Sequence, residues 1–368
     1  MNTPFKIFLV AAPSLEDVLL DEVHQLGYSD AVVVSGGVEF DGTWQDVWRA
    51  NLSLRGATRV LVRLGGFRAM HLAQLDKRAR KFPWADFLLA DVPIRVETTT
   101  RKSRIYHAGA ATQRIERAIV ETLCAKITTD AELVVKVRIF DDFCTFSIDT
   151  SGPALHIRGH KEALNKAPMR ETLASLFLRQ MGYDGTQSVV DPMCGSGTFP
   201  IEAAETAAGL LPGRSRSFAF EHLASFDQVV WDTLKSNVTS KDVQGQFFGF
   251  DRDMGAIRLS QENANRAGVE KMVEFRHGAI SDLTPPDVPP GIVIINPPYG
   301  GRIGERKMLF SLYGAMGQTL LTRFKGWKIG ILTTDGGLAK ATGLPFLPPM
   351  PPVPHGGKRV TLHRTNPI

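Results

Sequence analysis

Cysteine is scarce in this chain of 368 residues. Its 3 cysteines, Cys124, Cys144 and Cys194, form no CxxC pair and no Cys/His cluster with the spacing of zinc ligands. The sequence therefore argues against a disulfide framework and against a structural metal. A reducing, cytoplasmic compartment is the simplest expectation.

Long apolar runs are also missing. No stretch approaches the roughly 20 apolar residues that a membrane-spanning helix needs. The apolar start, Phe5–Ala12, is short, contains Lys6 and leads directly into an acidic segment, so we interpret it as a buried strand and not as a signal peptide. We expect no membrane partner.

Basic residues are concentrated in one part of the chain. Between Arg59 and Lys126 there are 14 Lys/Arg against 6 Asp/Glu, a surplus of 14 − 6 = +8, so the remainder of the +5 chain carries 5 − 8 = −3. This asymmetry favours a polyanion-binding module joined to another domain, whereas a solvated basic face is the alternative interpretation. The densest cluster is Arg101, Lys102 and Arg104.

The pattern of predicted strands and helices differs between two parts of the chain. Up to about residue 150, apolar strand patterns and amphipathic helix patterns mix as in α+β domains. From about Gly185, apolar strands alternate with helical patterns, which predicts an α/β fold with a doubly wound parallel sheet. The expected strands of that sheet are 188–190, 246–250, 272–275, 291–295 and 327–333, with a terminal strand at 358–363 after the Pro-rich stretch 345–354.

A glycine-containing turn, Asp191–Thr198, follows the first of these strands and opens a helix. Small residues at such a turn let a ligand approach the backbone closely. A phosphate-binding loop is disfavoured because the Lys-Ser/Thr pair is missing, and a dinucleotide fingerprint because its third glycine would fall at Pro200. A purely structural turn is the remaining alternative. The candidate cofactor contacts in the turn are Asp191, Cys194, Gly195, Gly197 and Thr198.

Two acids follow later strands of the same sheet. Asp251 ends the strand 246–250 and could accept hydrogen bonds from ribose hydroxyls, and Asp282 follows the next strand and could accept one from an adenine amine. Singly, each is a common loop residue. In register at the carboxyl edge of a parallel sheet, they predict a nucleoside pocket.

The second informative motif is Asn296-Pro297-Pro298-Tyr299-Gly300, directly after an apolar strand. An exocyclic amine on a base is a poor nucleophile because its lone pair is delocalised. The Asn296 amide oxygen and the Pro297 carbonyl could accept hydrogen bonds from that amine and direct its lone pair at a methyl donor. Tyr299 offers a ring face for a base extruded from its stack. The alternative interpretation is a proline-rich turn with a purely structural role.

Cys194 invites comparison with enzymes that attack a pyrimidine ring carbon through a thiolate. No basic partner is evident near it in the sequence, and a cysteine in a close-packed turn is usually a small buried side chain. We therefore do not expect a nucleophilic role for it.

With both motifs in place, the chain resembles the THUMP-domain class I RNA methyltransferases, the group of the large-subunit ribosomal RNA guanine-N2 methyltransferases and related transfer RNA enzymes. The resemblance rests on 191–204, 248–251 and 296–300, together with 217–221, 158–160 and 167–172. It implies a ferredoxin-like domain over residues 1–55, a THUMP RNA-binding domain over 56–155, and a Rossmann-like methyltransferase domain over 156–368. The second methyltransferase of the fused members is not expected here.

The resemblance also implies a cofactor and a reaction. The cofactor would be S-adenosylmethionine, with Pro168 and Glu171 against its methionine end and Asn296 near its methyl group. The reaction would be methylation of guanine N2 in structured RNA, first of all 23S ribosomal RNA and alternatively transfer RNA.

Three other functions share parts of these motifs. DNA adenine-N6 methyltransferases and protein glutamine methyltransferases also carry Asn-Pro-Pro-Tyr. The pieces around Pro168 and Phe218 disfavour the first, and the basic front half disfavours the second. An RNA-binding or ribosome-assembly factor with an inactive catalytic domain would predict eroded motifs, whereas both motifs are intact.

Overall fold

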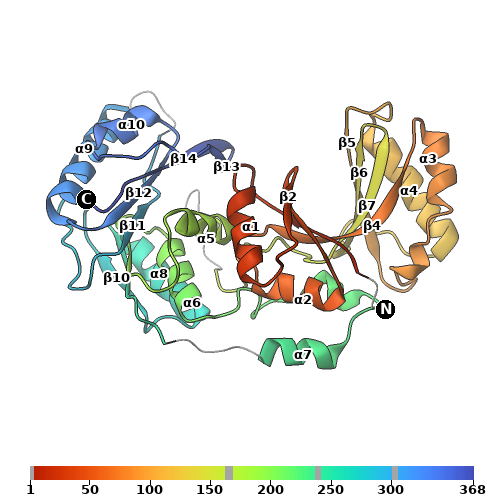
Figure 1. Cartoon of the computed structure of the whole chain (residues 1–368), viewed down its shortest axis with the longest axis horizontal. Coiled ribbons are helices and arrows are strands. Elements are labelled where there is room, and N and C mark those ends of the chain that lie inside the picture. Colours follow the sequence, from red (N-terminus) through yellow and green to blue (C-terminus); the bar gives the residue numbers. More distant parts are fainter. Residues whose placement is uncertain (1–3, 162–168, 237–241, 301–305) are drawn as a thin grey trace. The chain divides into compact units, whose positions relative to one another are not determined.

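The computed structural model describes residues 4–161, 169–236, 242–300 and 306–368 (Figure 1). These residues form two compact units. The first comprises the described parts of Met1–Ala11, Leu20–Leu155 and Arg216–Asn237, and the second those of Ala12–Leu19, His156–Ser215 and Val238–Ile368. Each unit is built on one seven-stranded sheet.

The first sheet has the strand order β2-β3-β1-β4-β7-β6-β5. All neighbours are antiparallel except β5 and β6, which run parallel. The strands are β1 (Phe5–Val10), β2 (Val32–Val34), β3 (Gly37–Gly42), β4 (Arg59–Arg68), β5 (Ile94–Arg101), β6 (Leu133–Phe140) and β7 (Phe143–Asp149). Strands β6 and β7 form a hairpin that turns at Asp141 and Asp142.

Strand β4 connects the two halves of this sheet. On one side it pairs with β1, with Val62 opposite Ile7, and on the other with β7, with Arg68 opposite Phe143. The register with β7 shifts between Arg63 and Gly65. The segments predicted as separate ferredoxin-like and THUMP domains thus share one continuous sheet.

Helices of the first unit follow local sequence signals. Helix α2 (Trp44–Ser53) begins at Thr43, whose backbone and hydroxyl both donate to the Asp46 carboxylate at 2.8 Å. Helix α4 (Ala108–Leu123) buries a stripe at helical spacing, including Ala111, Ile115 and Ile119, and packs on β5. The remaining helices with residues in this unit are α1 (Glu16–Gln25), α3 (Leu72–Ala79), η1 (Trp84–Asp86), η2 (Ala219–His222) and α7 (Gln228–Ser236).

The segment from Arg216, which the sequence placed in the catalytic domain, packs within the first unit. Its Phe220 lies 6.0 Å from Trp48 of α2 and 5.1 Å from Trp231 of α7, measured between ring centroids. Phe226 lies 5.7 Å from Trp48. Because Trp48 is only 2% exposed, this late segment completes a core that begins near the N-terminus.

The second sheet has the order β10-β9-β8-β11-β12-β14-β13. Its first five strands are parallel and the last two antiparallel, which confirms the predicted doubly wound sheet. The strands are β8 (Val189–Asp191), β9 (Phe247–Asp251), β10 (Val273–His277), β11 (Ile292–Ile295), β12 (Lys328–Thr333), β13 (Val353–His355) and β14 (Lys358–Arg364). The helices are α5 (Glu171–Gln180), α6 (Thr198–Ala207), α8 (Met254–Ala267), α9 (Arg306–Arg323) and α10 (Gly336–Ala341).

Strand β13 overlaps the end of the Pro-rich stretch 345–354, where no strand was predicted. It tolerates Pro354 because it is the edge strand, where a missing N–H costs no ladder hydrogen bond. No helix in the described ranges is long and apolar enough to cross a membrane.

Candidate cofactor and active site

The strand order of the second sheet reverses between β8 and β11. From β8 the chain proceeds to β9 on one side, whereas β11 lies on the other. At such a switch point, the loops at the carboxyl ends of neighbouring strands separate and leave a crevice for a ligand. Both predicted motifs, the turn after β8 and the loop after β11, begin at this crevice.

Backbone hydrogen bonds fix the turn after β8. The Cys194 N–H donates to the Phe250 carbonyl at 2.9 Å, and the Gly197 N–H donates to the Cys194 carbonyl at 2.8 Å. Gly197 has φ +80°, and a Cβ there would come within 2.9 Å of the Phe275 ring, so only glycine fits. Helix α6 then begins at Thr198, directly after this glycine.

Asp251, at the end of β9, holds this turn from the neighbouring strand. Its Oδ2 accepts the Gly195 N–H at 3.0 Å, and its Oδ1 accepts the Asp253 N–H at 2.9 Å. Each carboxylate oxygen has a second lone pair that can accept from a ligand hydroxyl. The predicted residues Gly195 and Asp251 are therefore brought together.

Asp191 is almost completely buried, with 2% of its surface exposed. Burial raises its pKa to about 8. The hydrogen bond from the Met193 amide lowers this pKa, whereas the nearby Asp251 charge raises it further. No cation offsets this carboxyl among the described residues. A cationic group of a ligand would do so.

Cys194 is buried too, with its Sγ 3.8 Å from the Ser260 hydroxyl. Burial holds the pKa of the thiol well above its usual range. A thiol in this state is a poor nucleophile, which agrees with the interpretation that Cys194 is a small packing residue.

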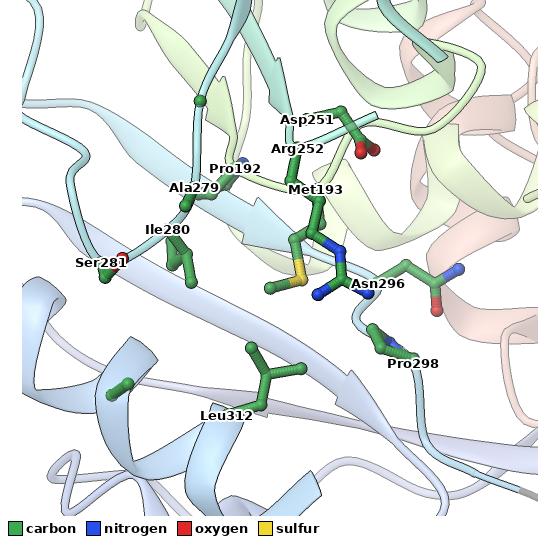
Figure 2. Close-up of a pocket in the computed structure, with 12 residues that line it drawn as sticks. Pro192, Met193, Asp251, Arg252, Ala279, Ile280, Ser281, Asn296, Pro298 and Leu312 are labelled. Carbon is green, nitrogen blue, oxygen red and sulfur yellow. The ribbon is translucent and has the colours of Figure 1, made fainter. Parts of the chain in front are cut away.

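A cavity of about 360 Å³ opens at the crevice (Figure 2). The four loops after β8, β9, β10 and β11 surround it, and α9 closes one side. Its volume is in the range of small-ligand sites. Its lining residues are Pro192, Met193, Asp251, Arg252, Gly278, Ala279, Ile280, Ser281, Asn296, Pro298, Leu312 and Ala315.

The cavity lining differs from the predicted residues at two positions. The lining includes Ser281 but not its neighbour Asp282, which is exposed and accepts a hydrogen bond from the Ser281 hydroxyl at 3.3 Å. Arg252 lines the cavity although the motif reasoning missed it. The signal was weak, because a basic residue after a strand-ending acid is common on surface loops.

Asn296 follows the fully buried strand β11. Its Oδ1 is buried, yet no described residue donates a hydrogen bond to it. A buried acceptor left without a donor costs about 1–3 kcal/mol. Figure 2 shows Asn296 and Pro298 on one side of the cavity and Ala279, Ile280 and Ser281 on another. The site therefore keeps an acceptor ready for a donor that the protein itself does not supply.

Tyr299 lies next to the cavity lining but is not part of it. Its ring is half-buried and packs against the hydrophobic core between the sheet and α9. Burial raises the pKa of its hydroxyl. Lys358 lies 5.6 Å from the ring centroid and donates to the Gly300 carbonyl at 2.6 Å. These contacts hold the ring in place through its faces and the neighbouring backbone.

Glu171 and Thr198 are linked through Lys161. The Lys161 ammonium lies 3.1 Å from the Glu171 carboxylate and donates to the Thr198 hydroxyl at 2.9 Å. Both groups are nearly buried, so this pair ties the start of α5 to the start of α6. Neither residue lines the cavity, and Pro168, the other predicted contact, lies outside the described residues.

The predicted RNA contacts Arg101, Lys102 and Arg104 lie in the first unit, at the end of β5 and in the loop before α4. All but Ser103 among residues 101–104 are exposed. Arg104 lies 3.7 Å from the Asp142 carboxylate. Within the described ranges, no group of His, Cys, Asp and Glu is arranged to hold a metal ion.

The strand order, the switch-point cavity and the loop after β11 define a Rossmann-like unit of the methyltransferase type. Residues 158–345 match the family described as the RMKL-like methyltransferase domain, residues 6–61 the RlmL ferredoxin-like domain, and residues 69–149 the THUMP domain. The chain therefore belongs to the RMKL-like methyltransferase family, which confirms the predicted resemblance and fold class.

Relatives and solved structures agree with this assignment. The ribosomal RNA large subunit methyltransferase K/L of Syntrophotalea carbinolica is 34% identical over 364 residues, which cover 94% of this chain and 51% of the relative. The chain spans about half the length of the K/L relatives it matches. The protein slr0064 of Synechocystis sp., named as an RNA methyltransferase, is 29% identical over 96% of this chain and 95% of its own.

Two solved structures share the fold over the whole chain. SMU.472, complexed with SAH, has a TM-score of 0.91 and 28% identity, over 100% of this chain and 99% of its own. A Listeria monocytogenes protein described as a predicted N6-adenine-specific DNA methylase has a TM-score of 0.90 and 29% identity, over 99% and 97%.

Proposed function

We propose that this chain is an S-adenosylmethionine-dependent RNA methyltransferase that methylates the N2 amine of a guanine in structured RNA, with large-subunit ribosomal RNA as the first candidate. The observation that carries the proposal is the buried Asn296 Oδ1 without a donor at the edge of a nucleoside-sized cavity. The match to the RMKL-like family and the names of the K/L relatives support it.

The residues present fit the cofactor. When bound, S-adenosylmethionine supplies an electrophilic methyl group on a sulfonium. Asp251 has free lone pairs for ribose hydroxyls, and its two backbone hydrogen bonds hold it rigid. The uncompensated carboxyl of Asp191 suits the cationic methionine end, and Ile280 and Leu312 offer apolar surface for a purine ring.

On the substrate side, Asn296 does the chemical work. Its Oδ1 accepts one N–H of the exocyclic amine and the Pro297 carbonyl accepts the other, so the nitrogen becomes more tetrahedral and its lone pair is directed at the methyl group. These hydrogen bonds strengthen as positive charge develops on the nitrogen, so they stabilise the transition state more than the bound substrate. Tyr299 supports the extruded base from one face.

The test is the identity of the product. RNA from a deletion strain is incubated with the purified chain and methyl-labelled cofactor, then digested to nucleosides and analysed by mass spectrometry, with Asn296→Ala as the matched control. We expect N2-methylguanosine with the wild-type chain and little or none with the variant. The Listeria structure favours adenine N6 as the second candidate, and N6-methyladenosine would keep the amine mechanism but replace the substrate. Methylation of a ring carbon would refute the mechanism.

A further inference from the structure

A row of four large side chains crosses the far end of the first sheet. Cα pairing places Arg68 of β4 opposite Phe143 of β7, Phe143 opposite Phe140 of β6, and Phe140 opposite Arg101 of β5. Residues directly opposite each other on neighbouring strands point to the same face of a sheet. We name this set, Arg68, Phe143, Phe140 and Arg101, the sheet-end row.

The row lies on the face of the sheet opposite to α3 and α4 (Figure 1). The alternate residues of β6, Val135, Val137 and Ile139, are at most 1% exposed and face α4, which packs on β5, and α3, which packs on α4. Figure 1 shows both helices on the same side of these strands. On the opposite face, Phe140 is 38% and Phe143 41% exposed. Both rings lie at the end of the sheet, on either side of the turn at Asp141 and Asp142, and each keeps more than a third of its surface exposed.

Small neighbours leave both rings accessible. The next row along the strands contains Gly66, Thr145 and Thr99, together with Arg138. A Cβ on Gly66 would come within 2.8 Å of Phe143 Cε1 and 2.3 Å of the Cys144 carbonyl oxygen, so the Phe143 ring lies close over bare backbone. The rings are therefore positioned by rigid strands before any ligand arrives.

The surroundings of the rings are positively charged. The Arg138 guanidinium lies 5.2 Å from the centroid of the Phe140 ring. Among the described residues, neither Arg138 nor Arg101 has an ion-pair partner, and Arg68 has only the exposed Asp141 at 3.9 Å. The chemistry is that of a stacking surface bordered by cations, which is complementary to bases on a phosphate backbone.

We propose that the sheet-end row, with Arg138, binds unpaired nucleotides of the RNA substrate by stacking bases on Phe140 and Phe143. This inference rests on the proposed RNA substrate, but it does not depend on methyl transfer. In a duplex the base faces are already stacked on one another, so only unpaired nucleotides can use the two rings. The row spans three strand spacings of about 4.8 Å, roughly 14 Å in all, which is enough for two or three bases.

Binding of two RNA probes tests the proposal. One is a fluorescein-labelled RNA hairpin with a blunt end, and the other is the same hairpin with a short single-stranded 3′ extension. In the double variant Phe140→Leu with Phe143→Leu, apolar bulk remains but the stacking surface is lost. We expect affinity for the extended hairpin to fall about 10- to 100-fold, since stacking is worth roughly 1–3 kcal/mol per base. Affinity for the blunt hairpin should not change.

Three controls separate stacking from other effects. The variant Phe140→Trp with Phe143→Trp should keep the preference for the extended hairpin. Val229→Ala, at an even more exposed apolar site on α7 of the same unit, should bind as wild type. Arg138→Gln should lower the salt dependence by about 0.7 log units, whereas the leucine variant should keep the wild-type slope.

Two outcomes would overturn the proposal. If the leucine variant binds the extended hairpin as tightly as wild type, the face serves another partner, such as a protein. If it weakens both hairpins equally, the rings act on the fold and not on bases. The assay measures binding alone, so it can support the proposal even where no methylated nucleoside forms. If the leucine variant binds and methylates RNA like wild type, stacking on the sheet-end row is refuted but the proposed function stands.

Discussion

Replacing Asp191 by asparagine is expected to stabilise the second unit at neutral and alkaline pH. Burial raises the pKa of Asp191 to about 8, whereas an unfolded aspartate has a pKa near 4. Between these values the folded state binds a proton that the unfolded state has lost, so stability is full at low pH and falls as the pH rises. At about 1.4 kcal/mol per pH unit, the carboxyl costs the folded state up to about 4 kcal/mol at pH 7.

Asparagine resembles the protonated carboxyl in shape and can still accept the Met193 N–H through its oxygen. Asp191→Asn should therefore match wild type at about pH 4 and exceed it by up to about 5 kcal/mol at about pH 8. Of the five tryptophans only Trp327 lies in the second unit, so urea unfolding followed by the fluorine resonance of 5-fluorotryptophan at that position reports on this unit alone. Asp287→Asn, an exposed carboxylate of the same unit, is the matched control and should change little. A gain that is absent at pH 8, or equal at both pH values, would refute the reasoning.

The other predictions concern ligands and turnover. Asp251→Ala should weaken S-adenosylmethionine binding by about 1–3 kcal/mol in calorimetry, and an unchanged affinity in a folded variant would remove Asp251 from the pocket. Asn296→Ala should lower kcat about 10²- to 10³-fold with nearly unaltered cofactor affinity, and a loss confined to KM would contradict its proposed role. Tyr299→Ala should weaken binding of the extruded base by roughly 1–3 kcal/mol, whereas Tyr299→Phe should be mild; equal losses would point to the hydroxyl. The last prediction concerns the basic cluster of Arg101, Lys102 and Arg104. Neutralising it should flatten the salt dependence of RNA binding by about 0.7–0.9 log units per lost contact without changing cofactor affinity. An unaltered slope would mean that the cluster is a solvated surface that does not contact RNA.

The sequence predicted the central strands of the second sheet well because β8, β9, β11 and β12 are largely apolar runs. The strand expected at 291–295 is β11 at Ile292–Ile295, and that at 327–333 is β12 at Lys328–Thr333. Both faces of a parallel strand inside a sheet are covered, so nearly all of its residues are apolar and the strand is visible in the sequence as a continuous apolar run. Helix α3 escaped prediction because only Leu75 and Ala79 of its eight residues are buried, which is too few for a visible stripe.

Site residues were predictable where a motif constrains the backbone. The turn at Gly197 and the loop at Asn296 follow their strands directly, so the sheet topology brings them together. Asp282 and Arg252 show where this reasoning ends. Arg252 lies in the short connection between β9 and α8, and Asp282 lies in the long connection between β10 and β11. In both, which of two adjacent side chains faces the cavity depends on backbone angles that residue type alone does not determine. The packing of Phe220 on Trp48 was equally hidden, because aromatic residues separated by more than 150 positions carry no mark of their partners.

Because residues 216–236 pack within the first unit, the core of that unit can be completed only late in the synthesis of the chain. A chain that leaves the ribosome from its N-terminus presents Trp48 early, but the rings of Phe220, Phe226 and Trp231 follow only after β8 and α6 of the other unit have been made. The first unit therefore cannot close its core while it is the only part outside the tunnel, and the nascent chain carries an unfinished apolar surface around Trp48 throughout that interval.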